Sequence, residues 1–283
     1  MDVRKGGPRE IRGFRGVQKT YKIFVNGEFV RSESGRAYRP DGGKVNVPRG
    51  SRKDLRDAVR AGRTAFPGWA SRTAMNRGQI LYRAAEMLDG RAAQFVELLG
   101  GGARARRELD SAVETLVWYA GWTDKLQQVT GTVNPVAGPY FNFTIPEPMG
   151  IVGIIAPEDA PLSGLVRRLA PALCGGNVVV ALAAESHPLA ALTLAEVLAT
   201  SDVPAGVVNI LSGQRKELVP WLASHMDVNA IDVAGCGADE IKAIEESAAG
   251  NVKRVIKVAE SDKSPYLVAA FMEMKTVWHP IGV

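Results

Sequence analysis

The side chains best suited to covalent chemistry in this sequence are the thiols of Cys174 and Cys236. Cys236 lies at the start of a predicted helix, and a helix N-terminus lowers the pKa of a thiol, which makes it a better nucleophile. Cys174 lies at an apolar helix end, where a buried thiol packs as a small hydrophobic group. None of the histidines (His187, His225 and His279) stands in a nucleophile-base motif. We therefore expect both cysteines to be inert and predict no catalytic residue.

The same residue types show no clustered spacing for a metal, so we predict no metal site. Two cysteines give no disulfide framework. The first eight residues lack the apolar core of a secretory signal, and the longest apolar runs, such as residues 177–184, are too short to cross a bilayer. These features predict a cytoplasmic protein without a membrane partner.

The net charge of +5 and the pI of about 9.2 raise the question of an acidic partner. Eight basic residues lie before position 32, so much of the excess charge is local. We interpret residues 1–20 as a flexible basic leader. Because no zinc spacing or aromatic-basic pattern accompanies these charges, we expect no nucleic-acid partner.

From Gly150 onward, short apolar strands alternate with helices, which is typical of a parallel sheet buried on both faces. The predicted strands are 151–156, 178–182, 207–211, 230–234 and 254–258. The predicted helices are 162–174, 189–200, 216–224 and 238–249. This βα alternation predicts the α/β class with a doubly wound, Rossmann-like parallel sheet.

Before this region, residues 21–30 predict a hairpin with Asn26-Gly27 as its turn, and residues 39–43 predict a second turn. Apolar residues at helical spacing then predict three helices, over 53–66, 76–91 and 109–126. The predicted organisation is a leader (1–20), an N-terminal part with hairpin, helices and a first flap strand (21–146), a nucleotide-binding-type domain (147–265) and a C-terminal strand (266–283).

Several motifs in this order together resemble the aldehyde dehydrogenase superfamily. They are Ala65-Phe-Pro-Gly-Trp69, Tyr119-Ala-Gly-Trp-Thr-Asp-Lys125, Glu147-Pro-Met-Gly150, Leu169-Ala-Pro-Ala-Leu-Cys-Gly-Gly-Asn177, Val203-Pro-Ala-Gly-Val-Val-Asn-Ile210 and Lys263-Ser-Pro265. The resemblance runs from Tyr21 to the end of the chain. It implies that the βα region is an NAD-binding domain.

The tail, Phe271-Met-Glu-Met-Lys-Thr-Val-Trp278, is similar to the family's last strand, which implies an oligomerisation flap. We expect it to pair across a subunit boundary, beside the strand near residues 140–145. In the family a catalytic domain with the nucleophilic cysteine follows the segment seen here as Lys263-Ser-Pro265, whereas only residues 266–283 follow here. This arrangement most resembles the incomplete second half of tandem-domain aldehyde dehydrogenases.

The resemblance also assigns site positions, and several of them differ from the family pattern. The family's oxyanion-binding asparagine corresponds to Asp159, and a carboxylate cannot donate a hydrogen bond to an oxyanion. Its adenosine-binding lysine and glutamate correspond to Leu182 and Glu185. Glu185 retains the ability to accept hydrogen bonds from ribose hydroxyls, whereas Leu182 has no donor.

Three further positions concern the cofactor phosphates and the general base. The family's Gly-x-Gly loop corresponds to Gly213-Gln-Arg215, where the arginine adds bulk and a charge that suits phosphate. Its Gly-Ser pair before a helix corresponds to Gly235-Cys236, whose backbone N–H groups can bind an anion. The general base falls in residues 259–262, but there the spacing differs by one residue, so Glu260 is not assigned that role.

From these positions we expect a non-catalytic protein that acts in assembly or regulation, as a homo-oligomer or with a complete aldehyde dehydrogenase. We expect weak or absent NAD binding, with Glu185, Gly213, Gly235 and Cys236 as a vestigial cofactor site. One alternative is that the chain is the NAD-binding part of an active, NAD-dependent aldehyde dehydrogenase whose catalytic domain is elsewhere. A second alternative is a nucleotide or anion sensor.

Overall fold

A seven-stranded sheet in the order β11-β10-β7-β8-β9-β1-β2 forms the centre of the computed structural model, which describes residues 19–258 and 263–282. The strands from β11 to β9 are parallel, and every residue of β7 and β8 is buried. Their bounds are β7 Ile151–Ile155, β8 Val178–Leu182, β9 Val208–Leu211, β10 Ala230–Asp232 and β11 Arg254–Ile256. The five predicted parallel strands are confirmed, four of them slightly shorter than expected.

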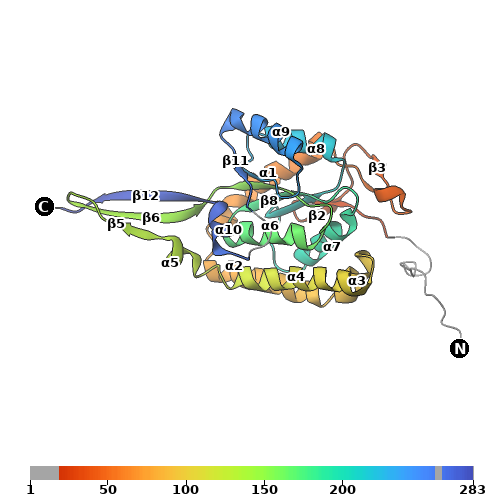
Figure 1. Ribbon diagram of the computed structural model, residues 1–283, viewed down its shortest axis with the longest axis horizontal. Helices are drawn as coiled ribbons and strands as arrows, with labels where there is room; N and C mark the ends of the chain where they lie inside the picture. Colours follow the sequence, from red (N-terminus) through yellow and green to blue (C-terminus); the bar gives the residue numbers. More distant parts are fainter. Residues whose placement is uncertain (1–18, 259–262, 283) are drawn as a thin grey trace.

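Helices cover both faces of this sheet, as Figure 1 shows. One face carries α1 (Arg52–Ala70), α8 (Arg215–Ser224) and α9 (Ala238–Ala248). The other carries α6 (Ser163–Cys174) and α7 (Pro188–Ala199), with α2 (Ala74–Asp89) and α4 (Gly102–Ala120) packed outside them. This doubly wound arrangement confirms the predicted fold class.

The predicted hairpin extends the sheet by β1 (Ile23–Val25) and β2 (Glu28–Val30), and β1 pairs antiparallel with β9. Asn26 (φ 54°) and Gly27 (φ 79°) take the two positive-φ positions that a tight hairpin turn requires. The remaining small elements are β3 (Ala37–Tyr38), η2 (Pro40–Gly42), β4 (Val47–Pro48), α3 (Ala92–Leu98), α5 (Leu126–Thr130), η3 (Ala249–Asn251) and α10 (Pro265–Ala270).

The boundaries of the predicted N-terminal helices need correction. The third helix begins at Gly102 and ends at Ala120, not at residues 109 and 126. Its first turns are rich in alanine, arginine and glutamate, which favour a helix without an apolar stripe. The apolar pattern alone therefore missed this segment and the short helix α3.

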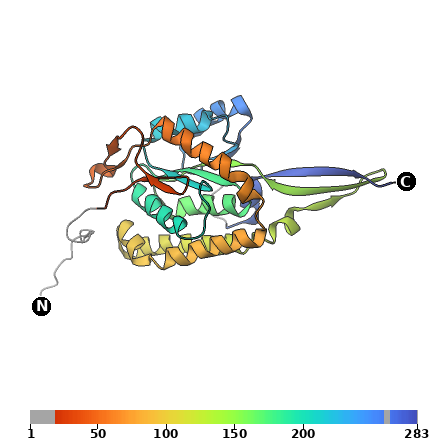
Figure 2. The ribbon, with the colours of Figure 1, turned by 180° about the vertical axis from the view of Figure 1, so that it is seen from behind.

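The C-terminal strand β12 (Met272–Pro280) pairs along its whole length with β6 (Tyr140–Pro148) of the same chain. We predicted pairing with this strand but across a subunit boundary, and the second part of that prediction is wrong in this structure. The chain returns beside Pro148 because Phe271 is fully buried and its carbonyl accepts a hydrogen bond from Asn177 Nδ2 at 2.9 Å. With β5 (Thr132–Asn134), these strands form a sheet that projects from the helices, here called the arm (Figures 1 and 2).

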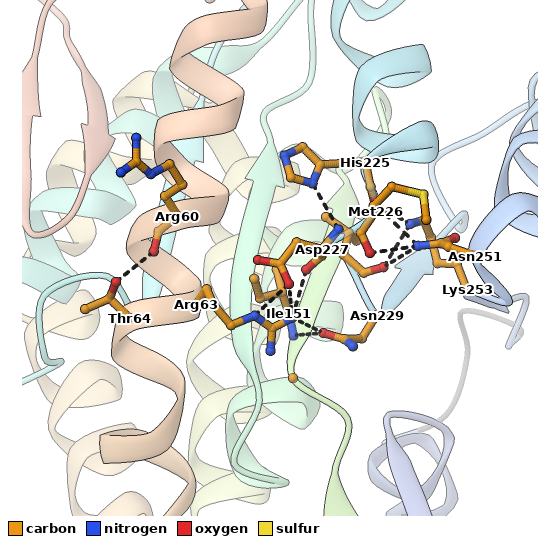
Figure 3. Close-up of polar contacts among 12 residues, drawn as sticks. Arg60, Arg63, Thr64, Ile151, His225, Met226, Asp227, Asn229, Asn251 and Lys253 are labelled. Atoms are coloured by element: carbon orange, nitrogen blue, oxygen red, sulfur yellow. Dashed lines mark hydrogen bonds and ion pairs between the residues drawn. The ribbon is translucent and has the colours of Figure 1, made fainter.

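A network of polar contacts joins the amino ends of β7 and β10 to each other and to α1 (Figure 3). Asn229 Oδ1 accepts hydrogen bonds from the Ile151 backbone N–H at 2.9 Å and from Arg63 of α1 at 2.8 Å. The Lys253 ammonium donates to the carbonyls of His225 and Val228, both at 2.8 Å. Since these contacts lie at the amino ends of the parallel strands, they stabilise the edge opposite to the one where such sheets bind ligands.

Candidate functional site

The candidate site lies at the carboxyl ends of the parallel strands, where doubly wound sheets usually bind ligands. A cavity of about 460 Å³ lies there beside Tyr38, Glu158 and Glu185. A smaller one, of about 220 Å³, lies between α8 and α9 beside Glu240. Arg215 lines both cavities. We call the two cavities together the strand-end crevice.

The Arg215 guanidinium is held by five groups of its own chain, and the longest hydrogen bond runs from Nη2 to Cys236 Sγ at 3.6 Å. Nη2 donates to the Gly235 carbonyl at 2.7 Å and pairs with Glu240 at 2.5 Å. Nη1 donates to the Ala156 carbonyl at 3.3 Å and lies 3.6 Å from a Glu158 oxygen. Burial alone would lower the pKa of Arg215, but the hydrogen bond and charge of Glu240 raise it above its usual value. Arg215 therefore stays charged and connects the ends of β7 and β10 with α9.

Glu158 and Glu185 are also engaged by the protein itself. Glu158 accepts hydrogen bonds from the backbone N–H groups of Glu185 (2.7 Å) and Ser186 (3.0 Å) and from the Ser186 hydroxyl. Burial raises the pKa of Glu158, but these hydrogen bonds and Arg215 outweigh it, so the net shift is downward. The Glu185 carboxylate accepts the Arg215 backbone N–H at 2.7 Å. The Glu185 carboxylate, which we expected to accept hydrogen bonds from a ribose, thus accepts one from the first residue of α8.

The two candidate glycines are constrained by packing within the chain. A Cβ on Gly235 would lie 2.3 Å from the Ile155 carbonyl oxygen, and one on Gly213 would lie 2.6 Å from a Leu218 methyl group. Both residues are therefore glycine because the strand ends pack closely against their neighbours, which leaves no room for a side chain.

The pKa of Cys236, which we predicted to be inert, is not lowered by the helix N-terminus that follows it. Burial and then the charge of Glu240 raise the pKa of the Cys236 thiol to about 12, although Arg215 acts in the opposite direction. Cys174 is buried in α6, and burial raises its pKa to about 12 as well. Both thiols are therefore protonated at neutral pH.

The remaining predicted positions lie apart from this cluster. Asp159 is exposed, and its backbone carbonyl accepts a hydrogen bond from Arg104. Leu182 ends β8 within the hydrophobic core, with 3% of its surface exposed. Glu260 lies outside the described residues, as does most of the predicted leader.

The sequence interpretation did not identify the partners of Arg215. Glu158 is the third residue after β7, and Glu240 lies in the first turn of α9. Polar residues at the carboxyl ends of parallel strands are a signal that could have identified them. Within residues 19–258 and 263–282, no group of three or more histidine, cysteine, aspartate or glutamate side chains is arranged to hold a metal. Across the same residues, no helix is long and apolar enough to cross a membrane.

Sequence and structure comparisons define the class of this protein. Residues 32–279 match the aldehyde dehydrogenase family, and the chain therefore belongs to that family. The resemblance deduced from the motifs is confirmed at the level of the family.

Among curated relatives, Retinal dehydrogenase 2 of Mus musculus is 37% identical over 268 residues, which are 89% of this chain and 51% of that protein. Aldehyde dehydrogenase 1A1 of Homo sapiens is 35% identical, over 88% of this chain and 52% of that protein. The NAD+ complex of the aldehyde dehydrogenase from Bacillus cereus matches with a TM-score of 0.77 and 28% identity, over 84% of this chain and 50% of that one. The chain thus spans about half the length of the relatives that it matches.

Proposed function

We propose that this chain is a non-catalytic member of the aldehyde dehydrogenase family that acts in assembly or regulation. The observation that carries the proposal is the engagement of Arg215 by Glu240, Glu158 and the Gly235 carbonyl inside the strand-end crevice. Arg215 thus occupies the part of the crevice where a doubly wound fold usually binds its cofactor.

The residues of the crevice fit poorly with NAD, which carries a negatively charged diphosphate. Asp239 and Glu240 occupy the first turn of α9, and Glu158 and Glu185 stand at the ends of β7 and β8. A helix N-terminus favours a negative charge, and here carboxylates of the chain already supply it. Arg215, the cation shared by both cavities, is neutralised by these groups, which leaves Arg39 and Lys216 as the other cations of the lining. We therefore infer that NAD binds weakly or not at all.

Aldehyde oxidation also requires a nucleophile and an oxyanion donor. Both thiols have pKa values raised to about 12, so almost none of either is thiolate at neutral pH. Asp159, at the position of the oxyanion amide, offers a carboxylate that cannot donate. These features support the absence of turnover by this chain.

The arm supports a role in assembly. The long edge of β12 that faces away from β6 pairs with no other strand of the described chain, and Tyr140, Phe141, Trp278 and Ile281 are substantially exposed. An open edge with apolar side chains favours pairing with another sheet. The partner is a second copy, as a homo-oligomer, or a complete aldehyde dehydrogenase. The chain would then correspond to the incomplete half of a tandem-domain protein, located in the cytoplasm.

The test of the proposal is NADH formation, followed by absorbance, with a panel of aldehydes at high protein concentration. We expect no turnover. Turnover that is abolished by Cys236→Ala but unaffected by Cys174→Ala would contradict the proposal and identify Cys236 as the nucleophile.

The alternative is that the chain is the NAD-binding part of an active aldehyde dehydrogenase, and its family membership and half-length match favour this alternative equally. Copurification from the native cell distinguishes the two roles. A catalytic polypeptide whose NAD-dependent activity depends on the strand-end crevice of this chain would support the alternative. A sensor that uses Arg215 and Gly235 is less favoured, because the Arg215 charge is already paired.

A further inference from the structure

A further cavity, of about 320 Å³, lies where the start of α1 meets the first two turns of α8. Its wall contains three cationic side chains, Arg36, Arg52 and Lys216, and an aromatic one, Trp221. The only carboxylate in this wall is Glu217. We call this cavity the basic pocket.

Glu217 does not balance the charge of these cations. Its carboxylate is bound by Arg49, through Nε at 3.0 Å and through a second hydrogen bond from Nη2. This side-on pairing with Arg49 is the main reason that the pKa of Glu217 is lowered. Arg36 lies farther from the same carboxylate, at 3.8 Å. One arginine outside the wall thus neutralises its single acid, and the wall keeps a positive charge.

Arg52 is held in place by stacking, without a charged partner. Its guanidinium carbon lies 3.9 Å from the centre of the Trp221 ring, which is the geometry of a cation–π contact. Within the described ranges 19–258 and 263–282, neither Arg52 nor Lys216 forms an ion pair. A stacked guanidinium keeps its edge N–H groups available for two parallel hydrogen bonds to an oxyanion.

We propose that the basic pocket binds the phosphate group of a small phosphorylated molecule. Arg52 supplies a fixed, planar pair of donors, and Arg36 and Lys216 supply two more charges within the same cavity. A doubly charged phosphate relieves the mutual repulsion of these cations. The volume lies at the lower end of the range for small-molecule sites, which suits a compact ligand.

The proposal does not depend on the proposed function, because Arg36, Arg52 and Trp221 do not line the strand-end crevice. Lys216 does line the smaller cavity of that crevice, so Arg52→Gln is the decisive variant. Lys242→Gln, an exposed lysine of α9, removes the same charge elsewhere and is the matched control.

The experiment is calorimetric titration of the full chain with inorganic pyrophosphate at constant ionic strength. We expect saturable binding that is weakened roughly tenfold or more by Arg52→Gln and left unchanged by Lys242→Gln. Thermal melting of both variants verifies that they fold. Binding that is absent, that is equally strong for Arg52→Gln, or that weakens equally with Lys242→Gln overturns the proposal.

Discussion

Arg215 is the residue on which the chemistry of the crevice depends. Without its guanidinium, the partly buried carboxylates of Glu158 and Glu240 would face each other with no counter-charge between them. Unpaired carboxylates of this kind are strongly destabilising. The arginine therefore has a structural role at a position where the family resemblance implied a glycine of the cofactor loop.

The raised pKa of Cys236 predicts how its reactivity changes with pH. Alkylation by iodoacetamide, measured by mass spectrometry in a Cys174→Ala background, is expected to rise roughly tenfold for each pH unit from 7 to 10, since the thiolate is a minor species below its pKa of about 12. A cysteine in an unstructured peptide, with a pKa near 8.5, provides the control and reaches a plateau within that range.

Glu240→Gln tests the cause of that shift, because it removes a negative charge that opposes the thiolate. Cys236 in this variant is expected to react faster than in the parent at every pH below 10. A plateau for the parent protein near pH 8 would show instead that the N-terminus of α9 activates the thiol.

The sequence predicts an inert Cys236, but the helix N-terminus also suggests a lowered pKa, and the direction of that shift was wrong. A helix N-terminus was visible in the sequence, and α9 does begin at Ala238. The burial of Sγ, which is the main cause of the raised pKa, depends on how α9 packs against its neighbours, although Glu240 stands only four residues after the thiol. In the same way, Arg215 pairs with both Glu158 and Glu240, which are far apart in the sequence. The spacing of these residues could not predict the two ion pairs.

At the scale of elements, the sequence predicts most of the strands and helices of the central sheet. The central parallel strands β7 and β8 are wholly apolar runs, so their position follows from burial on both faces. The arm is harder to predict, because β12 is mostly exposed and carries little hydrophobic pattern. The resemblance of β12 to the family's last strand correctly predicted β6 as its neighbour. Whether that β6 belongs to the same chain or to another one does not follow from the sequence, and the structure shows the same chain.

The network at the amino ends of β7 and β10 makes a prediction about stability. Lys253→Met removes the ammonium that donates to the carbonyls of His225 and Val228, and we expect it to lower the free energy of unfolding by about 2 kcal/mol. Lys257→Met is the control, because that ammonium is half-exposed and pairs, among the described residues, with Glu245, a contact whose loss costs about 0.5 kcal/mol or less. Denaturant unfolding measures both, and equal losses would show that the Lys253 contacts do not stabilise the fold.

At the scale of the molecule, the arm predicts the state of assembly. Removal of residues 273–283 keeps the buried Phe271 and Met272 and deletes the open edge of β12. We expect a smaller mass by light scattering than for the full chain, because the deleted edge is the predicted contact between copies.

A double substitution tests the same interface in the full chain, in case the truncated chain does not fold. Val277→Lys with Trp278→Lys places charges on both faces of β12 and leaves the backbone pairing with β6 in place. This variant is expected to dissociate as well. An oligomeric mass that is unchanged in both proteins would exclude the arm as the interface.

The most direct test of the account is calorimetric titration of the full chain with NAD. No saturation is expected at millimolar NAD. At least tenfold tighter binding is expected for Arg215→Gly/Glu240→Gln, which removes the guanidinium and its closest carboxylate together, while Glu158 keeps its hydrogen bonds from the backbone N–H groups of Glu185 and Ser186. Micromolar binding by the unaltered chain, or a double variant that binds no better, would contradict the claim that Arg215 closes the crevice.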